Sequence, residues 1–162
     1  MAAELKYTKL VESAVTPIKG SSGAAGYDLA AAFDYYVPGK SVGLINTGLA
    51  FEFPPGTYGR VAPRSGLSAK NINVSAGVID SGKLVIHTFV NLILNKPCLF
   101  TDYCGEVMIV LHNHGEADIL ISKGLRVAQL IIEKIENCVL VCDDTIRQRQ
   151  SDRQIHGFGS TD

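Results

Sequence analysis

Two aspartates in this 162-residue chain stand where a carboxylate could do chemistry. Asp80 closes the motif GVID, and Asp28 lies within AGYDL. A carboxylate held within hydrogen-bonding reach of a water can act as a general base. A carboxylate is also a usual ligand for Mg²⁺, often through the waters that the ion retains. Taken alone, each residue has a simpler interpretation, because aspartate is common in turns and exposed loops.

Three further stretches place polar or charged side chains beside glycine or apolar residues. The motif APRSGLS offers Arg64, Ser65 and Gly66, and glycine allows a close approach of the backbone. The C-terminal GFGST, residues 157–161, combines glycines with hydroxyls, which can wrap backbone N–H groups around an anion. Gln129 is the one polar residue of the apolar block AQLI; it is either a ligand contact or an outward-facing strand residue.

The elements that must position these residues read as strands. Turn-forming clusters of Gly, Pro, Asn and Ser separate short runs of alternating character, a pattern typical of an all-β sandwich or barrel. The clearest predicted strands are 49–53, 57–62, 106–111 and 126–135. A short helix is predicted at Ser65–Asn71. From Asp143 the chain becomes polar and loses the strand pattern, which predicts a core of residues 1–142 followed by a flexible arm, 143–162.

Composition narrows the partners and the compartment. The net charge of −1 creates no basic field for nucleic acid, so we expect no nucleic-acid binding. The longest apolar run, Leu84–Leu94, is too short to cross a bilayer, so no membrane partner is expected. No apolar signal-peptide core is seen near the N-terminus. The four cysteines have poor spacing for a zinc site and predict free, buried thiols, which suggests the cytoplasm or the nucleus.

The motifs occur in an order that resembles a known family. Together they are similar to the five motifs of the trimeric deoxyuridine triphosphatases, the dUTPases. The matching blocks are AGYDL (25–29), APRSGLS (62–68), GVID (77–80), DYCGEV (102–107), GLRVAQLI (124–131) and GFGST (157–161). The resemblance covers nearly the whole chain. It implies an all-β, jelly-roll-like barrel with a flexible C-terminal arm, assembled as a homotrimer with shared active sites.

The same resemblance implies Mg²⁺-dependent hydrolysis of dUTP to dUMP and pyrophosphate. This reaction limits uracil incorporation into DNA and supplies dUMP for thymidylate synthesis. Asp80 matches the catalytic carboxylate that activates water against the α-phosphorus. Asp28 matches the carboxylate that holds Mg²⁺, largely through water. The triphosphate contacts carry over to Arg64, Ser65 and Gly66, and an α-phosphate contact to Gln129.

The nucleoside would be held by the hairpin that carries Asp80. Tyr103 matches the tyrosine that packs on the deoxyribose and leaves no space for a 2′-hydroxyl; a core tyrosine is its simpler interpretation. The resemblance implies that backbone groups around Gly77, Val78 and Gly105 read uracil.

The arm would close the site. Phe158 matches a ring that covers uracil, a stacking contact worth ~1–3 kcal/mol. Gly159, Ser160 and Thr161 would close over the γ-phosphate, and Arg153 would neutralise phosphate charge.

The chain departs from the family pattern at several places. Cys104 stands where the family has arginine, Leu125 where it has aspartate, and Gln154 where it has glycine after the arm arginine. The segment before Gly157 is also longer than usual. It holds Arg147 and Arg149 as well as Arg153, so the choice of the arm arginine stays open.

The largest departure lies between Asp80 and Tyr103, which are separated by 22 residues. Removing Gly82–Thr101 would leave GVIDSDYCGEV, a normal family motif. The extra segment has three interpretations: an extension of the hairpin, a surface for a partner, or a translated, unspliced intron. Codons for Gly82-Lys83 and Thr101-Asp102 can carry a splice donor and acceptor in the matching phase. Reading the gene and its transcripts across this point tests the intron interpretation.

The segment also leaves a second function open. One alternative is a catalytically impaired isoform of the same fold that binds nucleotide or protein partners, because residues 82–101 interrupt the active-site hairpin. Another is the related dCTP deaminase branch, which the GVID and GFGST blocks disfavour.

Overall fold

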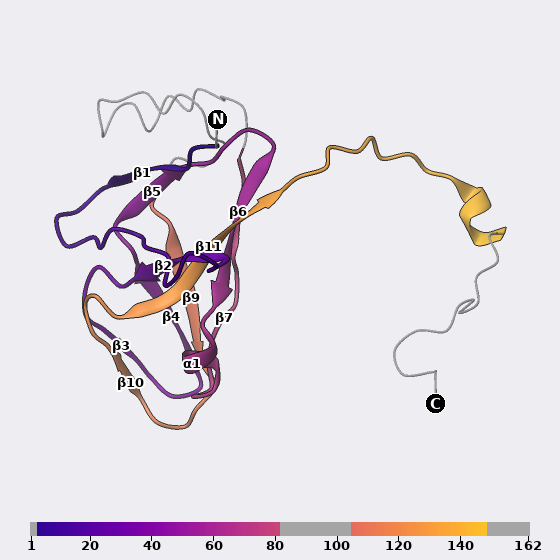
Figure 1. Cartoon of the computed structure of the whole chain (residues 1–162). Coiled ribbons are helices and arrows are strands. Elements are labelled where there is room, and N and C mark those ends of the chain that lie inside the picture. Colours follow the sequence, from indigo (N-terminus) through magenta and orange to yellow (C-terminus); the bar gives the residue numbers. More distant parts are fainter. Residues whose placement is uncertain (1–2, 82–104, 149–162) are drawn as a thin grey trace.

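The structure, a computed structural model, describes residues 3–81 and 105–148 of the chain (Figure 1). Almost all of its regular structure is β-strand, so the all-β prediction is confirmed. The strands are β1 Lys6–Lys9, β2 Gly26–Ala30, β3 Tyr35–Val37, β4 Ser41–Asn46, β5 Leu49–Glu52, β6 Thr57–Pro63, β7 Ile72–Val74, β8 Val78–Ile79, β9 Met108–Asn113, β10 Ile119–Ile121 and β11 Arg126–Lys134. One turn of helix, α1 (Ser65–Ser68), and a 3-10 helix, η1 (Asp144–Gln148), complete it.

The strands form antiparallel sheets around one core. One sheet has the order β2-β11-β6-β8 and another the order β4-β9-β7, while β1 pairs with β5 and β3 with β10. The inward faces of these sheets meet in a continuous apolar cluster. Its largest fully buried apolar side chains are Leu29, Ile45, Leu49, Ile109, Leu111, Ile121 and Leu130. Because side chains alternate along a strand, the residues between them face outward and are available for a site.

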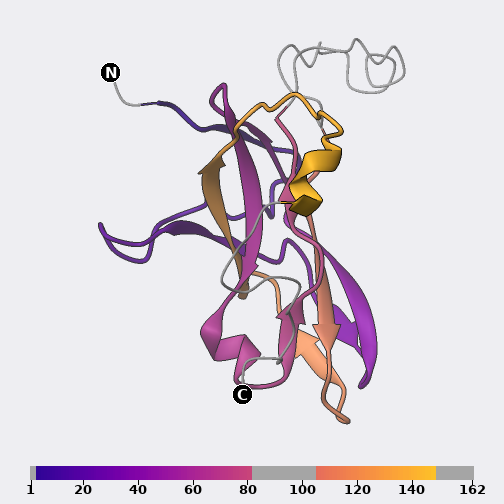
Figure 2. The same cartoon turned by 90° about the vertical axis from the view of Figure 1, so that its right-hand side faces the viewer.

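The predicted elements are present with small shifts at their ends. The helix predicted for Ser65–Asn71 stops at Ser68, and Asn71 takes a positive φ of 60°, a conformation that ends a helix. The strand predicted from Glu106 begins at Met108, because Glu106 and Val107 instead bond to the turn between β4 and β5. Figures 1 and 2 both show β6 running directly into α1.

The chain leaves the barrel after β11 (Figure 1). Residues 136–142 are exposed, and Val139 and Leu140 are 87% and 98% exposed. Beyond them Asp143 accepts hydrogen bonds from the backbone N–H and the hydroxyl of Thr145, which begins η1. The predicted polar arm thus contains a 3-10 helix in its described part. The division at Asp143 stays a prediction.

The cysteine prediction was wrong where the structure describes it. Cys138 and Cys142 are free thiols, as expected, but both are exposed because they lie on the segment that leaves the barrel. Cys98 and Cys104 lie outside the described residues.

An ion pair on the outer face joins β6 to β11. The Arg60 Nε and Nη2 atoms both lie 2.7 Å from Glu133 Oε1, and the Tyr58 hydroxyl donates to Glu133 Oε2. These hydrogen bonds, that of Arg60 first, hold the pKa of the Glu133 carboxyl below its ordinary value. A carboxyl with a lowered folded-state pKa stabilises the fold above its ordinary pKa. That contribution is lost as the pH falls through the lower value.

We therefore expect Glu133→Gln to lower the Tm by a few degrees at pH 7. The difference in Tm between this variant and the unmodified chain should become smaller as the pH falls below about 4.5, the ordinary pKa of a glutamate. Thermal melts across this range measure it. Glu116→Gln is the control, because Glu116 is 87% exposed and its ion pair with Lys40 should contribute little. A difference that is the same at every pH would contradict the assignment.

Candidate active site

A polar cluster lies on the outer face of the four-stranded sheet, near the end of β6. Gln129 of β11 pairs with Asp28 on one side and with Ala62 on the other, so both polar side chains share this face. The Gln129 Nε2 donates to the Pro63 carbonyl at 2.9 Å. That bond holds the amide across β6, and its second N–H can donate to a ligand.

Arginines from two elements converge on Asp28. Arg64 Nε lies 3.1 Å from Asp28 Oδ1, and Arg126 Nη1 lies 2.9 Å from Oδ2. Arg64 also donates from Nη1 to the Arg126 carbonyl at 2.8 Å, which ties the end of β6 to β11. The Asp28 side chain is only 14% exposed, so its charge is balanced within the chain. The cluster thus places two arginines beside the exposed turn at the start of α1, an arrangement that can bind a polyanion.

That open turn carries Ser65 and Gly66, both exposed at the start of α1. The first N–H groups of a helical turn have no acceptor within the helix and can point at an anion. A Cβ added to Gly66 would meet nothing within 4 Å, so the chain's own packing does not require glycine there. The predicted phosphate contacts Arg64, Ser65 and Gly66 therefore lie together with Gln129 and Asp28.

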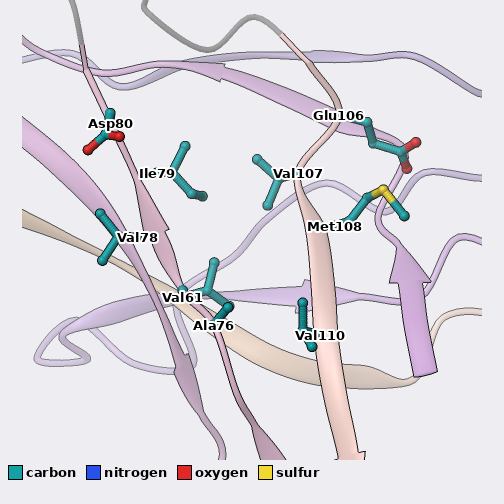
Figure 3. Close-up of a pocket in the computed structure, with 10 residues that line it drawn as sticks. Val61, Ala76, Val78, Ile79, Asp80, Glu106, Val107, Met108 and Val110 are labelled. Atoms are coloured by element: carbon teal, nitrogen blue, oxygen red, sulfur yellow. The ribbon is translucent and has the colours of Figure 1, made fainter. Parts of the chain in front are cut away.

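Asp80 lies elsewhere, at the rim of an apolar cavity of about 230 Å³ between β8 and β9. In Figure 3 the Ile79 and Val107 side chains face each other across this cavity, while Asp80 and Glu106 stand at its opposite sides. The lining residues are Val61, Ala76, Gly77, Val78, Ile79, Asp80, Glu106, Val107, Met108 and Val110. The predicted uracil contacts Gly77 and Val78 thus share one cavity with the predicted base.

Gly77 has a structural reason for being glycine. A Cβ there would overlap the Val61 carbonyl oxygen, and the Val61 N–H donates to the Gly77 carbonyl at 2.7 Å. Val78 is 69% exposed and Asp80 is exposed, so their outward groups can meet a ligand. Gly105, half-buried, begins the second wall of the cavity.

Within a single chain, the polar cluster that contains Arg64 and Gln129 (the Arg64–Gln129 cluster) lies far from Asp80 and its cavity. Ile79 pairs with Gly59, so Asp80 lies next to the start of β6, whereas Gln129 pairs with Ala62 near its end. Gln129 and Asp80 are also two strands apart in the sheet. At ~3.3 Å per residue and ~4.8 Å per strand, the separation is on the order of 16 Å. Two groups that contact the same phosphate must each lie within about 3 Å of its oxygens or its attacking water.

Several predicted site residues lie outside the described residues. They are Tyr103, Arg149, Arg153, Phe158, Gly159, Ser160 and Thr161, together with the whole segment 82–101. Their assignments stay predictions. Arg147 lies in η1.

Two residues with evident roles were not singled out from the sequence. Arg126 lies inside the block GLRVAQLI, and its charge next to an apolar strand could have marked it. Glu106 lies inside DYCGEV, but its partners Asn46 and Gly48 are about 60 residues away in the sequence, so no local pattern shows them.

The residues around Asp28 fit Mg²⁺ in one way only. In the described part of the chain no three His, Cys, Asp or Glu side chains gather closely enough to hold a metal ion. Among the described residues, Asp28 is therefore a single carboxylate with no second metal ligand grouped with it. Each of its oxygens accepts a hydrogen bond from an arginine and keeps a further lone pair. This donor set suits an ion that arrives with phosphates and keeps its waters.

Comparison with known proteins agrees with the motif order. The dUTPase family model matches residues 12–89 and 88–162, two stretches that meet inside the segment 82–101. The Saccharomyces cerevisiae deoxyuridine 5′-triphosphate nucleotidohydrolase is 44% identical over 151 residues, covering 92% of this chain and 88% of that protein. The enzyme of the same name from Paramecium bursaria Chlorella virus 1 is 43% identical over 164 residues, covering 98% of each.

Solved structures show the same fold. The Staphylococcus bacteriophage 80alpha dUTPase, solved with dUpNHpp, superposes with a TM-score of 0.79 at 24% identity and covers 98% of each chain. The phage phi11 D95N mutant dUTPase, described as coordinating a structural Mg(II) ion, gives 0.70 at 21% identity, covering 87% of this chain and 97% of that one. By its family model and its full-length relatives, the chain belongs to the dUTPase family.

Proposed function

We propose that this protein hydrolyses dUTP to dUMP and pyrophosphate, which keeps uracil out of DNA and supplies dUMP. The observation that carries the proposal is a pair of sites formed by the family's own motifs. One is the cationic cluster around Arg64 and Gln129, and the other is the apolar cavity with Asp80 at its rim. Relatives that are more than 40% identical over nearly the whole chain are deoxyuridine 5′-triphosphate nucleotidohydrolases. The comparisons give no support to the alternative of an impaired isoform.

In this mechanism Asp80 takes a proton from water as the water attacks the α-phosphorus. Its exposure at the rim of the cavity leaves its carboxylate accessible to that water. Arg64, Ser65 and Gly66 bind the triphosphate, and Gln129 donates to an α-phosphate oxygen. These donors stabilise charge that develops on the departing pyrophosphate. The apolar walls formed by Val78, Ile79 and Val107 take the base.

Mg²⁺ is proposed as the cofactor, held by the triphosphate and, through water, by Asp28. When bound, it supplies positive charge that neutralises the phosphate oxygens. Arg64 and Arg126 hold the Asp28 carboxylate in one orientation on both sides. An ion that kept its waters would therefore meet a fixed acceptor.

We further propose a homotrimer whose active sites are shared between subunits. The separation of about 16 Å between Asp80 and Gln129 supports it, because a single chain cannot bring both to one phosphate. In a shared site Asp80 of one subunit faces the Arg64–Gln129 cluster of another.

Exposed apolar residues provide surface for such an assembly. Val42, Leu44 and Met108 share the outer face of the β4–β9 pair and are all 40% exposed or more. Val139, Leu140 and Val141 lie exposed beyond the barrel. Contiguous apolar surface of this kind marks contact sites, and a second copy of the chain is the partner proposed. Neither helix in the described residues is long and apolar enough to cross a membrane.

The test is pyrophosphate release from dUTP by the purified chain. We expect hydrolysis of dUTP at least roughly a hundredfold faster than of UTP, dTTP or dCTP. A tight pocket rejects the additional hydroxyl of UTP and the methyl group of dTTP, and cytosine exchanges the donor and acceptor positions that uracil presents. Chelation with EDTA should suppress the rate and added Mg²⁺ should restore it. Ammonia release from dCTP would instead indicate the deaminase branch, and a chain that neither binds nor cleaves dUTP would refute the proposal.

A further inference from the structure

Glu106 lines the cavity but directs its carboxylate away from it. Figure 3 shows the side chain pointing away from Ile79 and the space between the two strands. Its Oε1 accepts a hydrogen bond from the Gly48 N–H at 2.6 Å, and its Oε2 accepts from the Asn46 Nδ2 at 2.8 Å. The half-buried carboxylate therefore binds the turn between β4 and β5, on the side of Glu106 that faces away from the cavity.

The same turn makes two further bonds to the next residue. The Thr47 hydroxyl, fully buried, donates to the Val107 carbonyl at 2.6 Å, and the Val107 N–H donates to the Leu49 carbonyl at 2.8 Å. Glu106 and Val107 are thus held by four consecutive residues, 46–49. We call this set of contacts the clasp.

The turn that forms the clasp is held by contacts of its own. Gly48 has a φ of 68°, and a Cβ there would lie 2.5 Å from the Val11 side chain, so no other residue fits without movement. The Asn46 amide is fixed by Tyr35, whose hydroxyl donates to Asn46 Oδ1 at 3.0 Å and accepts from the Asn46 N–H at 3.0 Å. Because Oδ1 is taken by a donor, Nδ2 must face Glu106.

The first wall of the cavity has separate anchors. β8 pairs with β6, the Val61 N–H donates to the Gly77 carbonyl, and the Ser81 hydroxyl donates to the Thr57 carbonyl. The first wall is therefore bonded to the barrel as far as Ser81, and the second wall is bonded to it from Glu106 onward.

We propose that Glu106 is a positioning residue for substrate binding, and that the clasp sets the second wall of the base-binding cavity independently of the connection between the walls. The proposal rests on the proposed function. Displacing Val107 and Met108 would loosen the base in the ground state and in the transition state alike. The expected signature is a raised KM with little change in kcat.

The hydrogen-bond pattern allows a paired test. Glu106→Gln places an amide N–H₂ against a donor, either Asn46 Nδ2 or the Gly48 N–H. Asn46→Asp places a second carboxylate against Glu106. In the double variant, the amide introduced at position 106 accepts from the Gly48 N–H and donates to the carboxylate introduced at position 46, which still accepts from the Tyr35 hydroxyl. Both single changes thus disrupt the clasp, and together they rebuild it.

Each single variant is expected to raise the KM for dUTP, and the Kd for its α,β-imido analogue, by about tenfold while kcat stays within about twofold. The double variant is expected to return within about threefold of the unmodified chain. Glu116→Gln, the same change in an exposed glutamate, is the matched control. Single variants with an unchanged KM, or a double variant no better than either single, would overturn the proposal.

Two further measurements distinguish a role of the clasp from a role of the segment Gly82–Thr101, and the failure of this inference from the failure of the proposed function. In a chain lacking Gly82–Thr101 the single changes should raise KM by the same factor; a smaller factor would show that the connection, not the clasp, sets the wall. If the unmodified chain neither binds nor cleaves dUTP, the proposed function fails. If it is active and KM is insensitive to the clasp, only this inference fails.

Discussion

Asp80→Asn is expected to lower kcat for dUTP by about 10²–10⁴-fold, the usual contribution of a general base, and to leave the affinity for α,β-imido-dUTP nearly unchanged. Asparagine has the size and hydrogen-bonding reach of aspartate but cannot accept a proton from water at neutral pH. Asp80 is exposed at the rim of the cavity, so the change should not disturb the core. Single-turnover hydrolysis and calorimetric binding would measure the two effects.

The control for this substitution is Asp34→Asn. Asp34 accepts a hydrogen bond from the Lys123 N–H in a loop far from the cavity, and an asparagine oxygen can still accept it. Activity should be retained there. Turnover that survives Asp80→Asn would show that Asp80 is not the base, and a joint loss of turnover and binding would assign it to substrate binding instead.

Mixed trimers are expected to recover activity that neither parent has. Asp80→Asn removes the base and Gln129→Ala removes the α-phosphate contact, so each variant alone should be nearly inactive. If every site takes Asp80 from one subunit and Gln129 from another, random mixing of equal amounts leaves roughly a quarter of all sites with both residues, and about one site in three within the trimers that contain both variants. The structural reason is the separation of about 16 Å within one chain.

The measurement uses two affinity tags, so that only oligomers containing both variants are purified after co-expression. Co-expression of two differently tagged Asp80→Asn chains is the control and should recover nothing. Mixed oligomers with no activity above their parents would mean that each site is built within one chain. A monomer in solution would exclude the shared site directly.

Much of the fold and the candidate site could be predicted from residues that are close in the sequence. Turn residues and alternation marked the strands now seen as β5, β6 and β11 within one residue at each end. The motif order identified the family, which the full-length relatives confirm. Strand ends were less certain, as at β9, because they depend on which partners bond to the Glu106 carboxylate and to the Val107 backbone groups.

The contacts that join distant residues could not be predicted in this way. Glu106 meets Gly48 and Asn46, and Arg60 meets Glu133, across 58 to 73 positions of sequence. No local periodicity encodes such pairs, since they depend on which strands the fold places side by side. The structural requirement for glycine at position 77 could not be predicted for the same reason. A Cβ there would overlap the Val61 carbonyl oxygen, a contact that exists only because β8 pairs with β6.

The sequence by itself determined the family, the all-β class and the chemical types of the site residues, because these are carried by short motifs and local alternation. Only the tertiary structure decided how those residues are distributed. The sheet order β2-β11-β6-β8 puts Asp80 and the Arg64–Gln129 cluster at separate places on one sheet, and this separation is the basis for the proposed shared site. It also bonds each wall of the cavity to the barrel at a different place, because β8 pairs with β6 while Glu106 and Val107 bond to the turn between β4 and β5.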